Sequence, residues 1–254
     1  LGTGVFGPNV SSNLFAVPMV MTRGASEVGL YIASSGKQSA MLGFLPLDEG
    51  DAPDSYGIAT HAMNQVNGVT GAAVNQPYFG DTRPDMDENL ERTDWKGDDK
   101  DGTGDEGIDQ ILPTDLKGNT NGMIALDRTR PGNYTLTVQA NTGGAPEAYA
   151  YAWVDFNQNG KFDENERSEK ATITKDGNVT LQFNNGPILS DLQLDKLGVR
   201  VRVSTYAPDI ESPTGMSMSG EVEDFETQVI FPPKGSKKET TNLQGVKQTA
   251  TVEF

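Results

Sequence analysis

The chain has 254 residues, and its 20 Lys and Arg residues against 36 Asp and Glu residues give a formal charge of −16 at neutral pH. A chain with this balance lacks the basic surface that nucleic acids and anionic lipids require, so neither is expected as a partner. With no cysteine and one histidine, His61, it offers no disulfide, no thiolate site and no cluster of imidazole ligands. No apolar run approaches the ~18 residues needed to span a bilayer.

The length fits one large all-β domain or two ordinary domains. Because Leu1 is not an initiator methionine, we expect the chain to be a piece of a longer protein. An acidic, cysteine-free and glycine-rich composition fits an exported bacterial surface protein, although a cytosolic protein is also compatible with it.

The first half of the chain divides into an apolar part and an acidic part. Three short apolar runs at residues 14–21, 28–33 and 41–45 predict strands within residues 1–50. Residues 51–109 are rich in turn-formers, and within them residues 81–109 hold twelve acids and four bases, which is half of the net charge. A region this acidic repels itself unless water or cations intervene, so it is either a solvated loop or one ordered by Ca²⁺.

Residues 110–231 have the pattern of a β-rich module. Alternating or β-branched runs predict strands at residues 134–138, 148–154, 172–174, 179–183, 199–204 and 225–231. Asp176-Gly177 predicts a hairpin between two of these strands, and residues 190–197 predict a short helix. Many short strands separated by turns indicate an all-β sandwich or jelly roll with little helix. Pro232 and Pro233 end the last strand, and residues 232–254 are predicted to be a linker.

One loop has the ligand spacing of an EF-hand-type calcium site. Oxygen-bearing side chains fall at positions 1, 3, 5, 9 and 12 of a dodecapeptide, glycine is at position 6, and position 7 offers its carbonyl. The predicted Ca²⁺ ligands are Asp155, Asn157, Asn159, Lys161, Asp163 and Glu166. The segment before the loop alternates like a strand, so a helix-loop-helix is not expected. The alternative is an Asn159-Gly160 hairpin whose acids face water.

A catalytic interpretation has weaker support. Glu221 and Glu223 would share one face of a strand beside Asp224, but carboxylate pairs are common in so acidic a chain. His61 has no Gly-x-Ser-x-Gly elbow to accompany it, and no phosphate-binding glycine loop is present. The residues alone therefore leave a carbohydrate-active enzyme as the least favoured alternative.

Several motifs, in order along the chain, together resemble a known family. They are residues 51–57, Thr60-His61, Pro77-Tyr78-Phe79-Gly80, Pro84-Asp85, the acidic loop 97–107, residues 153–160, Arg200-Val201-Arg202-Val203, and Gly220-Glu221-Val222-Glu223-Asp224-Phe225. This string is similar to the Gly-Glu-Val-Glu-Asp domain of large bacterial secreted and surface proteins. Within that group it resembles the lectin-like second non-repetitive domain of CshA-type fibrillar adhesins of Gram-positive bacteria, with the tail resembling the start of the fibril repeats. Phe225 stands where many members have Tyr, which removes a hydroxyl.

The resemblance implies a lectin-like β-sandwich over residues 1–231, displayed on a cell-wall-anchored fibril outside the cell. It implies adhesion to a host glycoprotein such as fibronectin, or to a glycan, by a monomeric module, and it implies no enzyme activity. A calcium-stiffened structural spacer is the alternative. From the chemistry of aromatic faces and carboxylates, the predicted ligand contacts are Asp51, Asp54, Tyr56, Tyr78, Asp85, Asp87, Trp95, Glu221, Glu223 and Asp224.

Overall fold

The fold is all-β, as the sequence predicts. The computed structural model describes residues 46–63, 75–84, 92, 95, 124–127, 129–184, 186–188, 196–227 and 229–230, and the backbone of two further strands at 236–241 and 247–252. Contacts divide the chain into Leu1–Gly43 and Phe44–Phe254, and all the described residues belong to the second unit. The strands predicted at 14–21, 28–33 and 41–45 lie outside the described residues.

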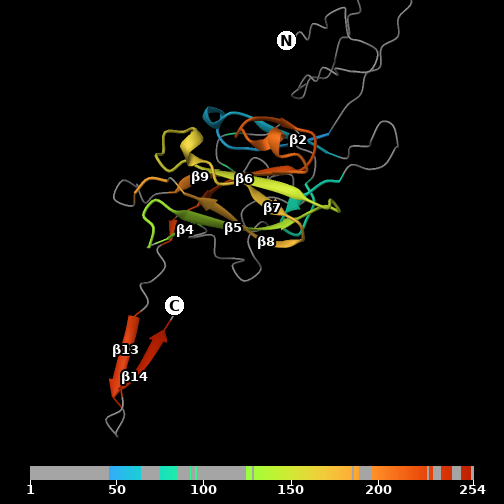
Figure 1. The fold of residues 1–254 in the computed structure, drawn as a ribbon. Helices are drawn as coiled ribbons and strands as arrows, with labels where there is room; N and C mark the ends of the chain where they lie inside the picture. The colour runs from blue at the N-terminus through green and yellow to red at the C-terminus, as the bar shows by residue number, and fades with distance from the viewer. Residues whose placement is uncertain are drawn as a thin grey trace, which may run out of the picture. The chain divides into compact units, whose positions relative to one another are not determined.

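Two sheets face each other as a sandwich (Figure 1). The first has the order β11-β9-β6-β7, with strands Glu221–Thr227, Leu197–Ser204, Ala148–Val154 and Ala171–Ile173. The second has the order β12-β4-β5-β3, with strands Val229–Ile230, Ile124–Leu126, Tyr134–Asn141 and Tyr78–Phe79, and β8 (Gly177–Phe183) also pairs with β5. The sandwich predicted from sequence is therefore present.

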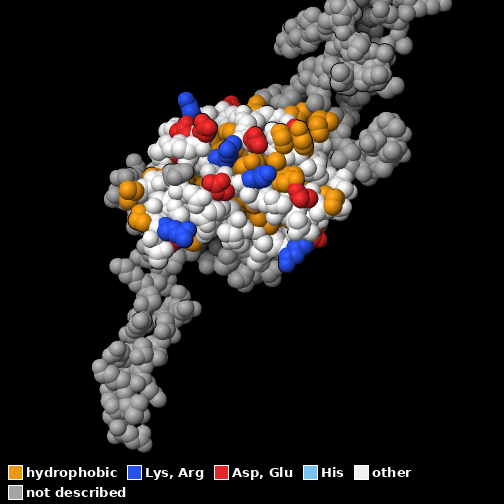
Figure 2. All heavy atoms as spheres, viewed as in Figure 1, with side chains coloured by type: hydrophobic (Ala, Val, Ile, Leu, Met, Phe, Trp, Pro, Cys, Tyr) orange, Lys and Arg blue, Asp and Glu red, His pale blue; other side chains and the backbone are white. Residues whose placement is uncertain are grey.

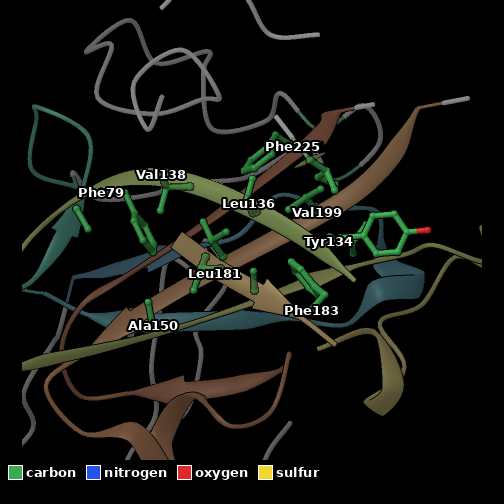
Figure 3. Packing of buried hydrophobic residues seen from close by; sticks show 14 of the residues in the cluster. Phe79, Tyr134, Leu136, Val138, Ala150, Leu181, Phe183, Val199 and Phe225 are labelled. Atoms are coloured by element: carbon green, nitrogen blue, oxygen red, sulfur yellow. The ribbon is translucent and has the colours of Figure 1, made fainter. Parts of the chain in front are cut away.

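The space between the sheets is filled by the main apolar core. Strand β6 contributes Ala148, Ala150, Ala152 and Val154, while its alternate residues face the other way, so the predicted alternation of small and aromatic residues is confirmed. Strands β5, β8 and β9 supply the larger aliphatic and aromatic side chains (Figure 3). Phe225 lies in this core at 3% exposure.

A third, smaller sheet covers the other face of the first sheet. It contains β1 (Leu47–Glu49), β2 (Ala59–Ala62) and β10 (Gly215–Ser217), with β2 between the other two. Two short 3-10 helices accompany it, η1 (Asp54–Tyr56) and η5 (Ala207–Ile210). Figure 1 shows β2 on the side of β6 and β9 away from β5 and β8. Residues 51–109, predicted to be a loop region, therefore contribute strands β2 and β3.

Two predicted connections differ from the structure. The Asp176-Gly177 turn does not close a hairpin, because β7 pairs with β6 in the first sheet and β8 pairs with β5 in the second. The turn instead carries the chain from one sheet to the other. The closing strand predicted at 225–231 begins earlier, at Glu221, and divides into β11 and β12, which also belong to different sheets.

The C-terminal segment predicted to be a linker contains a hairpin of its own. Strands β13 (Ser236–Thr241) and β14 (Lys247–Val252) pair antiparallel. Most of the helix predicted at 190–197 lies outside the described residues, and its last residue, Leu197, begins β9. No helix in the described part of the chain is long and apolar enough to cross a membrane.

The turn into β11 depends on Gly220. Its φ is +91°, and a Cβ there would lie 1.7 Å from the carbonyl oxygen of Val203 on β9. We expect Gly220→Ala to lower the free energy of unfolding by more than about 2 kcal/mol, because it adds a backbone clash to the left-handed strain. Gly215→Ala is the control, since φ is +96° there but a Cβ would meet nothing within 4 Å. Urea denaturation measures both variants, and equal losses would contradict the role of the clash.

Candidate functional site

The candidate site is the face of the first sheet that the third sheet covers. In β9 and β11, opposite residues share a face, so Arg200 lies opposite Asp224 and Arg202 opposite Val222. Val199, Val201 and Val203 face the main core, as predicted. The two arginines face away from that core, yet both have 0% exposure because the third sheet and the loops around β10 close over them.

A fully buried ion pair joins β9 to β11. Arg200 Nε and Nη2 donate to the two carboxylate oxygens of Asp224 at 2.7 and 2.6 Å. The remaining nitrogen of Arg200, Nη1, donates to the backbone carbonyls of Gly57 and Pro213. Asp224 in turn accepts the backbone N–H of Ala52 at 2.9 Å. The pair therefore holds two loops, distant in sequence, against the sheet.

Arg202 and His61 form a second buried pair. Arg202 Nε donates to His61 Nε2 at 3.1 Å, while His61 Nδ1 donates to the carbonyl of Ser219 at 2.8 Å. Burial, and then the positive charge of Arg202, hold the pKa of His61 well below its usual range. Burial, and then the charge of Arg200, lower the pKa of Arg202 to about 9, so it remains charged at neutral pH. His61 therefore serves as a neutral acceptor inside the fold.

The acids of the predicted catalytic and ligand-binding group are internal. Glu221, Glu223 and Asp224 have exposures of 0%, 1% and 4%. The carboxylate of Glu221 accepts the backbone N–H of Phe79 on β3, and Asp48 on β1 accepts the N–H of Val222. These acids fasten β11 to its neighbours. The expectation that Glu221, Glu223 and Asp224 contact a ligand is therefore corrected, because a ligand cannot reach them in this fold.

The other predicted ligand contacts are divided between layers. Asp51 is 1% exposed and so also unsuited to ligand contact, whereas Asp54 on η1 is exposed and Tyr56 is half-buried. The rings of Tyr56 and Trp95 meet edge to face, with centroids 4.8 Å apart. Tyr78 lies on β3 in the second sheet, with the Arg83 guanidinium over its ring. Asp85 and Asp87 lie outside the described residues.

Tyr56 and Trp95 belong to an aromatic cluster on the outer face of β6 and β9. The cluster contains Tyr151, Trp153, Phe162 and Ile210, with Tyr56, Trp95 and Tyr149 packed against it. Trp95 fits there because Gly198 has no side chain: a Cβ at that position would lie 2.5 Å from the indole ring. Trp153 is 1% exposed. Figure 2 shows hydrophobic side chains interspersed with both acidic and basic ones on the visible face.

The predicted calcium loop begins where β6 ends and is tightly hydrogen-bonded. The carboxylate of Asp155 accepts the backbone N–H groups of Asn159 and Gly160 at 3.0 and 2.9 Å, and the Tyr56 hydroxyl at 2.7 Å. Gly160 makes the sharp turn with φ of +78°. The Asn159-Gly160 hairpin considered from sequence is not formed, because a 3-10 helix, η3 (Glu164–Glu166), follows the turn.

Glu166 closes the loop from inside the protein. It is 1% exposed, and its two carboxylate oxygens accept the backbone N–H groups of Asn157 and Asp163 at 3.2 and 3.0 Å. Burial raises its pKa to about 7, with a further small contribution from Asp155 and Asp163. Asn157, Asn159 and Lys161 are exposed and Asp163 is partly exposed, so the loop has a buried end and an open end. In the described residues no three Asp, Glu, His or Cys side chains gather as a metal cluster.

Comparison with known proteins identifies part of this region. The family model of the GEVED domain matches residues 149–228. This match includes β6, β9 and β11, both buried arginines, the predicted calcium loop and the Gly220–Asp224 motif itself. No curated protein and no solved structure matches the chain.

The residues of the GEVED domain that sequence reasoning missed are Arg200 and Arg202. They alternate with valines in β9, and such alternation normally indicates a face open to solvent. The Gly220–Asp224 motif on the neighbouring strand could have indicated that these arginines are buried. Its Asp224 supplies the negative charge that a buried arginine requires. His61 was singled out from sequence only as a histidine without a nucleophile elbow. It is instead the buried acceptor of Arg202.

Removing the charge of Asp224 tests the buried pair in the GEVED domain. Asp224→Asn preserves size but leaves Arg200 buried without a counter-ion, so we expect the free energy of unfolding to fall by about 3–5 kcal/mol. Glu226→Gln is the matched control two residues along, because the Lys196–Glu226 pair is 3.1 Å long with Lys196 mostly exposed. Glu226→Gln should lower the free energy of unfolding by no more than about 1 kcal/mol. Chemical denaturation compares the two, and a similar loss in both would contradict the assignment.

The buried neutral His61 predicts a pH dependence. Its pKa in the folded state lies below the usual 6.5, so the unfolded state binds more protons as the pH falls below that value. Stability from this group is present above pH 6.5 and is lost towards lower pH, by at most about 1.4 kcal/mol per pH unit. The raised pKa of Glu166 acts in the opposite direction between 4.5 and about 7.

The contribution of His61 is isolated by comparison with His61→Gln, which retains a hydrogen-bond acceptor and a donor. The difference in urea midpoint between this variant and the original protein should change between pH 7.5 and 5. A difference that stays constant over this range would contradict a buried neutral His61.

Proposed function

We propose that the chain is a non-enzymatic adhesion module of a bacterial surface protein, which binds a host glycoprotein such as fibronectin, or a glycan, through loops on the β-sandwich. The main observation in support of this proposal is the GEVED domain match on an all-β fold whose acidic motif is buried. Glu221, Glu223, Asp224 and His61 all have partners inside the protein, and this supports a scaffold role for the motif over an acid–base pair.

The proposed contact surface is formed by helix η1, in the middle of the 46–63 segment, and by Trp95, which packs beside it. Asp54 is exposed, and the half-buried rings of Tyr56 and Trp95 follow it on the outer face of the first sheet. Aromatic faces pack on sugar rings or apolar side chains, while a carboxylate accepts hydroxyl, Lys or Arg donors. Contacts beneath these two rings hold them in place, which favours a role in recognition. The Tyr56 hydroxyl donates a hydrogen bond to Asp155, and the Trp95 ring packs against Gly198.

Binding of the full chain to immobilised fibronectin and to a glycan array, each with Ca²⁺ or with EDTA, tests the proposal. We expect binding to at least one surface, weakening as salt rises because the protein is acidic. Asp54→Ala and Trp95→Phe should each raise the dissociation constant by about 10-fold, which is about 1.4 kcal/mol. Tyr206→Ala is the control, because Tyr206 is an aromatic residue that is 60% exposed on a different loop.

The outcomes separate the adhesin from its alternatives. No binding to either surface would refute the proposal and favour a structural spacer. Binding that the Asp54 and Trp95 variants leave unchanged would move the contact surface elsewhere on the sandwich. Hydrolysis of a glycoside, abolished by Glu221→Gln, would favour an enzyme.

A further inference from the structure

Two carboxylates lie buried at the two ends of the 155–166 loop. Asp155 and Glu166 are each 1% exposed. Asp155 accepts two backbone N–H groups and the Tyr56 hydroxyl, and Glu166 accepts two backbone N–H groups. Among the described residues, no Lys, Arg or His pairs with either of them. Neutral donors reduce the cost of burying two carboxylates but supply no positive charge, which a cation bound in the loop would supply.

The loop that joins these two carboxylates carries oxygen atoms of the kind that suit a hard cation. The loop offers carboxylate, amide and backbone oxygens at positions 1, 3, 5, 7, 9 and 12, from Asp155, Asn157, Asn159, Lys161, Asp163 and Glu166. It offers no sulfur or imidazole ligand, so it is not expected to prefer a transition metal. Ca²⁺ accepts six to eight oxygens in flexible geometry, which this mixture of side-chain and backbone oxygens can supply.

The hydrogen bonds of the open end leave these oxygens able to bind. Asn157 Nδ2 and Asn159 Nδ2 both donate to Asp163 Oδ2, at 3.1 and 2.8 Å. These amides hold the partly exposed Asp163, and no hydrogen bond joins them to Asp155 or Glu166. The side-chain oxygens of both asparagines accept one backbone N–H each, from Asn159 and Lys161, and an amide oxygen has a second lone pair.

We propose that residues 155–166 bind one Ca²⁺, with Asp155 and Glu166 as its buried ligands and Asn157, Asn159, the Lys161 carbonyl and Asp163 completing the shell. The ion neutralises the two buried carboxylates. It also fixes the carboxylate that receives Tyr56, and so stabilises the attachment of the 46–63 segment to the end of β6. This inference is independent of adhesion, because the charge balance is the same whatever the module binds.

Calorimetry and thermal melting of the full 254-residue chain, with Ca²⁺ and with EDTA, test the site. We expect one Ca²⁺ per chain, a dissociation constant of about 1 mM or tighter, and a melting temperature that Ca²⁺ raises. Glu166→Gln should weaken Ca²⁺ binding by at least about 10-fold. Because this change removes a buried charge, it should not destabilise the protein in EDTA. Glu164→Gln is the matched control, since Glu164 lies exposed in the same loop and should leave Ca²⁺ binding unchanged.

A second variant and a second probe keep the test decisive if Glu166→Gln fails to fold. Asn159→Ala alters an exposed ligand and should also weaken Ca²⁺ binding. Tb³⁺ bound to the original protein should luminesce when the nearby aromatic cluster is excited, and excess Ca²⁺ should displace it. The proposal is overturned if millimolar Ca²⁺ gives neither heat nor a change in melting temperature. It is also overturned if Glu166→Gln and Glu164→Gln bind Ca²⁺ as the original protein does.

Discussion

The buried pair of Arg200 and Asp224 is the constraint on which the outer half of the molecule depends. The guanidinium uses Nε and Nη2 for the carboxylate and Nη1 for the carbonyls of Gly57 and Pro213. A lysine could not reproduce this, because its ammonium lacks the planar fork that matches a carboxylate. Since burying charge is costly, the value of such a pair lies mainly in specifying one arrangement of the loops around it.

The molecule thus has two interiors with different chemistry on the two faces of one sheet. The inner face of β6, β9 and β11 packs into an apolar core that fixes the sandwich. The outer face carries Arg200, Arg202, Asp224 and the aromatic cluster, and this polar interior fixes the segments above it. The GEVED motif contributes to both interiors, because its residues alternate between the two faces of β11. The motif is consequently a structural feature of the fold, because its acids are buried.

Asp155 connects the 155–166 loop to the rest of this outer layer. It ends β6, accepts two N–H groups from the loop, and accepts the hydroxyl of Tyr56 from a segment about a hundred residues earlier in the chain. Tyr56 then contacts Trp95 and Phe162, whose rings complete the aromatic cluster. A change in charge at Asp155 therefore alters its hydrogen bond to Tyr56, and through it the packing of the aromatic residues that we propose as the contact surface.

The sequence by itself determined the features that local chemistry controls. Alternation at 134–138 and 148–154 predicted β5 and β6, and the Asp, Asn and Gly spacing at 155–166 predicted a tight loop rich in oxygens. These features could be predicted because strand pleating and turn formation depend on neighbouring residues.

Only the tertiary structure decided what covers each face. It placed β7 and β8 in different sheets across a turn that looked like a hairpin, and it buried Arg200, Glu221 and Asp224 beneath strands that begin more than a hundred residues earlier. Alternation shows that a strand has two kinds of face, but whether the polar face meets water or a third sheet depends on distant segments. Exposure, and with it the choice between structural and ligand-binding acids, therefore came from the fold.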